Sequence, residues 1–344
     1  MKIKRFTIIN IILEQNVKQQ SVNGFLMSSL DKYLYKVPFK WSFLHPKYWG
    51  TWLMVLFLVI CAYTPVKIRD WIAVRLTGFV YRIAKKPVHV IDCNLKACFS
   101  DMTEEERKAL IYKNIEMFLL SVLGQAELAF RSKCHIMSRY NVQGLEHFKK
   151  IVDDGEQAIF VAGHTWGLEY AGTYFMAGGM PMVTFINEHK NPIYNWLSVR
   201  QRTRFCDSVY VREGGIRVML KGMKEGKHLF FLPDQDHGAD KCEFATFFDT
   251  QKASLPILSR LCKATKGRII PLHIAYDVEY HRFNLTIEPP FDCSGAEDCK
   301  ESEAQFLNHL IEDLIMRDLT QYMWILRILK TRPEGENCIY KKKK

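Results

Sequence analysis

The chain has 344 residues, of which 48% are hydrophobic and 25% charged, and its formal net charge is +11 at pH 7. This composition excludes a disordered chain and a simple bundle of membrane helices, and the length allows one large domain or two modest ones. The charge predicts a basic surface, which fits nucleic acid, anionic lipid head groups or a phosphorylated substrate equally well.

The ten cysteines are scattered along the chain, and no two of them form a CxxC pair. Structural zinc sites use closely spaced ligands, so these cysteines do not predict one. The chain is also too long and too poor in cysteine to resemble a small disulfide-rich domain. Reduced thiols in a cytosolic environment are therefore the expected state.

The first residues, MKIKRFTIINIIL, mimic a secretory signal peptide because a basic start precedes an apolar stretch. No small-residue cleavage site follows, and the polar run EQNVKQQ interrupts the pattern, so cleavage is not expected. Met27 is a plausible alternative start, which would make residues 1–26 an upstream addition. We assign residues 1–40 to an N-terminal extension.

Residues 49–66, WGTWLMVLFLVICAYTPV, include no charge over about 18 positions, just enough for a helix to cross a bilayer. Trp49, Trp52 and Tyr63 lie toward its ends, where aromatic side chains meet the membrane interface. We predict a transmembrane helix here; the alternative is a buried core helix. Basic residues are more numerous just after this segment than just before it, which favours a cytoplasmic C-terminal body.

The next stretch, RDWIAVRLTGFVYRIAKK (69–86), mixes apolar side chains such as Trp71 and Phe79 with basic ones. This pattern predicts a helix lying in the membrane interface, with its basic side toward the head groups. The alternative is an ordinary amphipathic helix docked on the folded domain. We therefore assign residues 41–90 to a membrane anchor with an interfacial helix.

From about residue 101 the sequence becomes helical, with Asp101 or Thr103 as N-cap and acidic side chains in the first turn. Apolar runs predicted to be strands then alternate with helical stretches: 157–163, 182–186, 208–211, 228–232 and 268–277. Their nearly continuous apolar character predicts an α/β fold, with a mostly parallel central sheet flanked by helices. Residues 282–290 should form a hairpin partner at the sheet edge, and residues 302–319 a final helix.

The segment VAGHTWGLEY (161–170) places His164 at the end of a predicted strand, where ligands gather in open α/β sheets. If a helix begins just after it, Glu169 lies about one turn in, and its carboxylate can reach back to one imidazole nitrogen. The other nitrogen would then be a general base. The chain has no G-x-S-x-G elbow, so the base would activate a substrate hydroxyl. The competing interpretation is a coincidence of spacing.

A second polar cluster follows another predicted strand in FFLPDQDHG (230–238), where Asp234, Asp236 and His237 lie close together. Side chains of these types suit three uses: binding a metal ion, supporting a base, or forming Asx turns. The segment by itself does not choose among the three.

Basic side chains concentrate in RQRTRF (200–205), and Arg212 lies just beyond. Their position between two predicted strands makes them candidates to clamp a phosphate or to stabilise an oxyanion. The alternative is that they form a solvated face.

Together these segments resemble a known family, the late (secondary) acyltransferases of lipid A biosynthesis in Gram-negative bacteria, and most closely its myristoyltransferase branch. The resemblance covers about residues 40–336, in the order of the family. It is carried by FLHPKYWGTWL (43–53), GHTWGLE (163–169), NPIYNWL with RQRTRF, LPDQDHG (232–238), FFDTQKASLPILSRL (247–261), IIPLHIAYD and YMWILRILKTRPEGE (322–336). LPDQDHG and the last segment are highly specific, whereas GHTWGLE is less so.

The resemblance implies transfer of a fatty acyl chain, expected to be myristoyl, from acyl carrier protein to the 3-hydroxyl of a hydroxyacyl chain on the Kdo-bearing lipid A precursor. By motif position it implies that His164 and Glu169 are the catalytic pair, with Arg202 and Asp234 as further catalytic residues. Substrate contacts are expected from Arg204, Arg212, Asp236 and His237. Members of the myristoyl branch often have aspartate where this chain has Glu169.

This chemistry agrees with the residues. Cleavage of the donor thioester supplies the free energy for acyl transfer, so no cofactor or metal is expected. No covalent acyl-enzyme is expected either. A general base that activates the acceptor hydroxyl typically raises the rate by about 10² to 10⁴. The positive charge of Arg202 could stabilise the oxyanion of the tetrahedral intermediate. The basic surface could attract the negatively charged acceptor, anionic lipid head groups and the acidic carrier protein. The expected location is the bacterial inner membrane, with a single span and a catalytic domain (91–344) on the cytoplasmic face.

Three alternatives stay open. A lauroyl-type enzyme of the same pathway would share these motifs. A glycerol-phosphate type membrane acyltransferase shares the H-x4-D/E pair, but its usual blocks elsewhere are not found. A membrane-tethered binding protein would use its basic face without catalysis; the sequence contains no zinc finger, RNP stretch or basic zipper, so nucleic acid is not expected as its partner.

Overall fold

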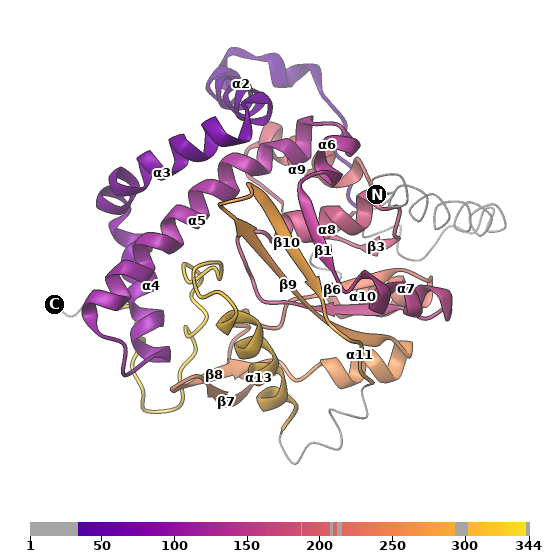
Figure 1. The fold of residues 1–344 in the computed structure, drawn as a ribbon. Coiled ribbons are helices and arrows are strands. Elements are labelled where there is room, and N and C mark those ends of the chain that lie inside the picture. Colours follow the sequence, from indigo (N-terminus) through magenta and orange to yellow (C-terminus); the bar gives the residue numbers. More distant parts are fainter. Residues whose placement is uncertain (1–33, 187, 207–208, 212–214, 293–301, 342–344) are drawn as a thin grey trace.

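A computed structural model of the chain describes residues 34–186, 188–206, 209–211, 215–292 and 302–341. Two predictions concern residues outside these ranges and stay predictions. They are the N-terminal segment that mimics a signal peptide, within the proposed addition 1–26, and the candidate residue Arg212. Figure 1 shows a central sheet with long helices along one side and shorter helices on the other.

The main sheet has the strand order β1-β10-β9-β2-β6-β3. The strands are Tyr140–Gln143 (β1), Arg282–Ile287 (β10), Arg268–Asp277 (β9), Ala158–Val161 (β2), His228–Phe231 (β6) and Met182–Val183 (β3). Of the five pairings, four are parallel, and that of β9 with β10 is antiparallel. All residues of β2 are buried, as their uninterrupted apolar character requires. The predicted mostly parallel α/β sheet is confirmed.

The observed strands differ from the predicted ones in three places. Residues 182–186 divide into β3 and Phe185–Ile186 (β4), which pairs with Tyr210–Val211 (β5) in a separate sheet. The hairpin of β9 and β10 forms, but its predicted place at the sheet edge is wrong, because β1 pairs with the outer side of β10. A further hairpin, Glu243–Phe247 (β7) with Thr250–Ser254 (β8), has no clear sequence signal, since polar side chains interrupt both strands.

Helices connect the strands. Their bounds are Lys85–Cys98 (α4), Glu104–Phe130 (α5), Lys133–Met137 (α6), Leu145–Asp153 (α7), Leu168–Ala177 (α8), Pro192–Thr203 (α9), Gly215–Lys224 (α10), Leu258–Thr265 (α11) and Glu303–Met316 (α13). Thr103 is the N-cap of α5 and forms a capping box with Glu106, which settles the choice between the two predicted caps. Helix α5 packs against α4 along one side of the sheet (Figure 1).

The predicted transmembrane segment forms a helix. Two short 3-10 turns, Trp41–Leu44 and Pro46–Tyr48, lead into Trp49–Tyr63 (α2). The 18-residue stretch Pro46–Tyr63 is long and apolar enough to cross a membrane, by length and composition, and only 17% of it is buried. Helix α2 lies at the outside of the molecule (Figure 1), unlike a helix in the centre of a globular core.

Helix α3, Val66–Ile83, exposes many of its apolar side chains, and its buried residues are Arg69, Asp70, Ala73 and Thr77. Trp71 is 60% exposed, whereas Arg69 is 2% exposed and its guanidinium lies 2.6 Å from the carboxylate of Glu127 on α5. The predicted outward position of the basic side is therefore wrong only for Arg69, which a buried ion pair holds against α5. Arg75 and Arg82 are exposed, as are the apolar side chains of Trp71 and Phe79.

Seven described cysteines are reduced and take part in no disulfide: Cys61, Cys93, Cys98, Cys134, Cys206, Cys242 and Cys338. Cys262 in α11 is disulfide-bonded, so the expectation of reduced thiols is wrong for this residue. Sequence spacing cannot reveal such a bond, because folding is what brings distant cysteines within bonding reach.

Candidate active site

The side chains of His164 and Asp234 meet at the carboxyl edge of the main sheet. His164 lies between β2 and α8, and Asp234 follows β6. Because β2 and β6 are parallel neighbours, the turns that follow them come together. The imidazole Nδ1 lies 2.5 Å from Asp234 Oδ1, and the backbone N–H of His164 donates to Oδ2 at 2.7 Å. One carboxylate thus binds both the ring and the backbone of the histidine.

The C-terminal motif YMWILR forms another wall of the site. The hydroxyl of Tyr322 donates to Asp234 Oδ2 at 2.9 Å, and the backbone N–H of Met323 donates to the carbonyl of His164 at 2.7 Å. Gly163 allows this approach, since a Cβ there would lie 3.3 Å from the Tyr322 ring. Tyr322 is a functional candidate that the sequence patterns do not single out, although it begins the segment 322–336 that carries the family resemblance.

Asp234 is a buried anion. Burial alone would raise its pKa, because its side chain has no solvent exposure. The electrostatic interaction with the His164 ring and the hydrogen bonds from its ring and backbone outweigh this effect and lower the pKa of Asp234 below its usual value. An ionised carboxylate at this place keeps the imidazole proton on Nδ1 and leaves Nε2 as the nitrogen that accepts a proton.

The side-chain amide of Gln235 lies against that second nitrogen, with 3.0 Å between its Nε2 and the imidazole Nε2. With the ring proton on Nδ1, the amide donates and the imidazole accepts. Gln235 is not among the residues selected from the sequence. Its place between Asp234 and Asp236 is the signal that would have found it.

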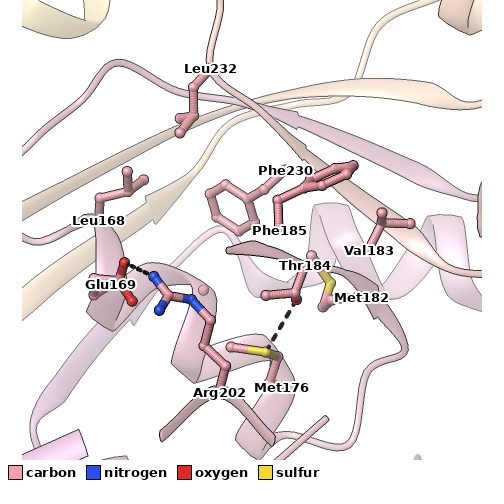
Figure 2. Close-up of a pocket in the computed structure, with 11 residues that line it drawn as sticks. Leu168, Glu169, Met176, Met182, Val183, Thr184, Phe185, Arg202, Phe230 and Leu232 are labelled. Carbon is pink, nitrogen blue, oxygen red and sulfur yellow. Dashed lines mark hydrogen bonds and ion pairs between the residues drawn. The ribbon is translucent and has the colours of Figure 1, made fainter. Parts of the chain in front are cut away.

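The prediction that Glu169 orients His164 is wrong. The strand, turn and helix follow one another as expected, and Glu169 lies in the first turn of α8. That turn directs its carboxylate toward α9, where Oε1 lies 2.5 Å from a guanidinium nitrogen of Arg202 (Figure 2). The two side chains are 34% and 20% exposed, so solvent partly screens the ion pair. His164 and Glu169 therefore do not contact each other through their side chains: His164 pairs with Asp234, and Glu169 pairs with Arg202.

Glu169 and Arg202 also line an apolar cavity of about 180 Å³. The other lining residues come mainly from α8 and from β3, β4 and β6: Leu168, Gly172, Met176, Met182, Val183, Thr184, Phe185, Phe230 and Leu232. Figure 2 shows the ion pair on one side of this cavity and the rings of Phe185 and Phe230 on the other. Walls of this kind suit a hydrocarbon chain whose polar group stays near the charged side.

The cavity adjoins the segments that carry His164 and Asp234. Leu168 follows His164 by four positions, and Leu232 precedes Asp234 by two. The segments that carry the acid–base pair therefore also contribute side chains to the wall of the cavity.

Arg204 makes a structural contact. Its guanidinium donates to the carbonyl oxygens of Leu128 and Arg131, each at 2.7 Å. Leu128 belongs to the last turn of α5, where helix carbonyls lack partners within the helix. The guanidinium therefore holds the end of α9 to the end of α5, and the substrate contact of Arg204 stays a prediction.

Asp236 shapes the loop after β6. Its carboxylate accepts hydrogen bonds from the N–H and hydroxyl of Thr331, at 2.6 and 2.7 Å, and from the N–H of Gly238 at 3.0 Å. The last contact is an Asx turn, one of the three predicted uses of this segment. His237 is exposed. Within the described part of the chain, no group of three or more His, Cys, Asp or Glu side chains could hold a metal ion.

Comparison with known proteins adds independent information. Residues 36–331 match the family model described as bacterial lipid A biosynthesis acyltransferase. The chain is 35% identical over 303 residues to a lipid A biosynthesis acyltransferase of Haemophilus influenzae, covering 88% of this chain and 94% of that protein. A lipid A biosynthesis myristoyltransferase of Escherichia coli is also 35% identical over 303 residues, with coverages of 88% and 93%. A lipid A biosynthesis lauroyltransferase of Escherichia coli is 30% identical over 300 residues, with coverages of 86% and 96%.

Proposed function

Since the chain belongs to the bacterial lipid A biosynthesis acyltransferase family, and is therefore an acyltransferase, we propose a specific reaction for it. In this proposal a myristoyl chain passes from acyl carrier protein to the 3-hydroxyl of a hydroxyacyl chain on the Kdo-bearing lipid A precursor. Family membership supports the lipid A precursor as acceptor. The myristoyl chain is supported by the motifs and by the 35% identity to a myristoyltransferase.

The observation that carries the proposal is the hydrogen-bonded pair of His164 and Asp234 next to an apolar cavity. His164 Nε2 removes the proton of the acceptor hydroxyl while the hydroxyl oxygen attacks the thioester carbonyl carbon. Asp234 stabilises the imidazolium that forms. When the tetrahedral intermediate collapses, the carbon–sulfur bond breaks and the proton passes from Nε2 to the leaving thiolate. No covalent acyl-enzyme forms in these steps.

Arg202 is proposed to stabilise the oxyanion of the tetrahedral intermediate, since its guanidinium lies in the wall of the same cavity. Glu169 would hold that guanidinium in place through their ion pair. Glu169 is then a positioning residue that acts through Arg202, while His164 is oriented by Asp234.

The cavity is proposed to receive the acyl chain of the donor, because its walls are mainly apolar. Lauroyl transfer is the second candidate, since the matched lauroyltransferase covers nearly as much of this chain as the myristoyltransferase does. Family membership argues against a glycerol-phosphate type acyltransferase and against a binding protein without catalysis.

Helices α2 and α3 are proposed to hold the enzyme at the bacterial inner membrane. Helix α2 would span the bilayer, and α3 would lie in the interface with Trp71 and its other exposed apolar side chains among the lipids. The charge of +11 would attract anionic head groups and an acidic carrier protein. The basic residues after the span favour a catalytic domain on the cytoplasmic face.

The proposal is tested by the mass of lipid A from cells with and without the gene. Deletion is expected to remove the mass of one myristoyl chain, and a plasmid copy to restore it. His164→Ala should not restore it, whereas His309→Ala, which changes an exposed histidine on α13, should. A mass difference of another chain length would replace myristoyl by that chain. Unchanged lipid A after deletion would refute the proposed reaction.

A further inference from the structure

Both ring nitrogens of His164 are hydrogen-bonded, Nδ1 to Asp234 and Nε2 to the amide of Gln235 at 3.0 Å. The second contact occupies the nitrogen that removes the proton in the mechanism proposed above. An acceptor hydroxyl therefore has to displace the Gln235 amide before His164 can act on it.

The loop that carries Gln235 is fixed on both sides of the residue. Asp234 is held by Tyr322, and Asp236 by the backbone and hydroxyl of Thr331. A glutamine side chain has several rotatable bonds, and rotamer changes occur without movement of the backbone. The amide can thus leave Nε2 and return to it while the loop stays in place.

We infer that Gln235 has a guarding role: its amide occupies Nε2 of His164 and keeps water from being activated there, so that His164 acts on the acceptor hydroxyl in preference to water. The inference rests on the proposed role of His164 as general base. If water reached Nε2, its oxygen would attack the thioester carbonyl carbon and the carbon–sulfur bond would break. The proton would pass through Nε2 to the thiolate, so that the products would be a free fatty acid and a free thiol.

Water and a lipid acceptor differ in their ability to displace the amide. The acceptor contacts the enzyme at many points away from the reacting hydroxyl, and this binding free energy can drive the displacement. Water has no such contacts and competes with a tethered amide of high effective concentration. The side chain of His164 is 12% exposed, so water can reach the ring, and an amide that occupies Nε2 can lower the rate of hydrolysis.

The test compares Gln235→Ala with the wild-type full chain in detergent, using myristoyl-acyl carrier protein as donor and a Kdo-bearing lipid A precursor as acceptor. Transferred and free myristate are measured separately by mass spectrometry. The ratio compared is the rate of hydrolysis without acceptor divided by the rate of transfer at saturating acceptor, where acceptor binding has already displaced the amide. The loss of one hydrogen bond predicts a rise of about five- to tenfold in this ratio, and a lower KM for the acceptor. The matched control, Gln157→Ala, removes an amide just before β2 and should keep the wild-type ratio.

Two variants separate the possible outcomes. An unchanged ratio in Gln235→Ala, with His164→Ala inactive in both reactions, would overturn the guarding role and leave the base intact. Full activity of His164→Ala would overturn the base and the inference with it. Gln235→Asn keeps the amide but shortens its reach, so it should show the same raised ratio. A wild-type ratio in Gln235→Asn would also overturn the guarding role, even if the alanine variant failed to fold.

Discussion

The imidazole of His164 is held by the carboxylate of Asp234, a residue 70 positions later in the chain, through a contact of 2.5 Å. The same carboxylate accepts hydrogen bonds from the His164 backbone and from the hydroxyl of Tyr322. One buried anion therefore determines both the position of the ring and the nitrogen that carries its proton. This relationship, and not the local H-x4-E spacing, is the centre of the site.

Asp234→Asn is expected to abolish most activity while preserving the fold. The amide has nearly the same shape, but it favours the wrong imidazole tautomer and cannot stabilise an imidazolium, a change that costs about 10⁴ in kcat in comparable sites. The measurement is the rate of acyl transfer by the purified variant, with circular dichroism as a check of folding. A folded variant with activity within tenfold of wild type would contradict the assignment.

Tyr322→Phe removes only the hydroxyl that donates to Asp234. The ring still packs against Trp324, whose centroid lies 4.8 Å away, so the core remains filled. A hydrogen bond to a charged acceptor contributes about 1.5–3 kcal/mol, so kcat should fall by about tenfold and the unfolding midpoint should drop. Tyr280→Phe, at a position 60% exposed, serves as the control and should change neither quantity.

Glu169 and Arg202 should act as one unit, because they form an ion pair in the cavity wall. Glu169→Gln is expected to lower kcat/KM by about tenfold, and Arg202→Met by about 10², the range for loss of an oxyanion donor. The double variant should be no worse than Arg202→Met alone, because Glu169 acts through the arginine. Fully additive losses in this double-mutant cycle would show that Glu169 acts elsewhere.

Gly172→Leu is expected to shorten the acyl chain that the enzyme accepts. Gly172 lines the cavity from α8, and a Cβ there would lie 3.9 Å from the Met176 side chain, so a larger group enters open space without a backbone clash. Each methylene excluded from an apolar site costs about 0.8 kcal/mol, so preference should move from C14 toward C10 donors. Competition between donors of different length measures this, with Gly172→Ala as an intermediate. An unchanged preference for acyl chain length would show that the cavity does not bind the acyl chain.

Acid should destabilise the protein through two buried histidines. Burial lowers the pKa of His228 and of His273 from 6.5 to about 4, and His228 Nδ1 accepts the N–H of Ala158 at 3.0 Å. Because the folded pKa lies below the unfolded one, the unfolded state binds the proton first. Stability is complete above about pH 6.5 and falls as the pH drops toward 4, by up to about 3 kcal/mol for each histidine.

Unfolding midpoints in detergent between pH 7.5 and 4.5 measure this effect. His228→Gln removes one of the two titrating groups, so its midpoint should fall less steeply with acid than that of the wild type. A steeper fall than wild type would contradict the assignment of His228 as a buried neutral side chain.

Local patterns were sufficient for most individual elements. The apolar run 157–163 contains β2, Thr103 caps α5 as its hydroxyl and the following acidic turn predict, and α2 coincides with the uncharged stretch. These features are decided by side chains a few positions apart, so the sequence carries them directly. The family also followed from the sequence, because the order of several specific motifs is itself a linear property, and the comparisons confirm it.

The sequence by itself thus determined the mostly parallel α/β architecture, the apolar helix α2 and the family. Only the tertiary structure decided which carboxylate orients His164, because the answer depends on β2 and β6 being neighbours, and strand order is set by the packing of the whole chain. For the same reason, only the folded molecule shows where Tyr322 and Gln235 lie. Each contacts a residue at least 70 positions away, and local sequence spacing does not predict contacts over such separations.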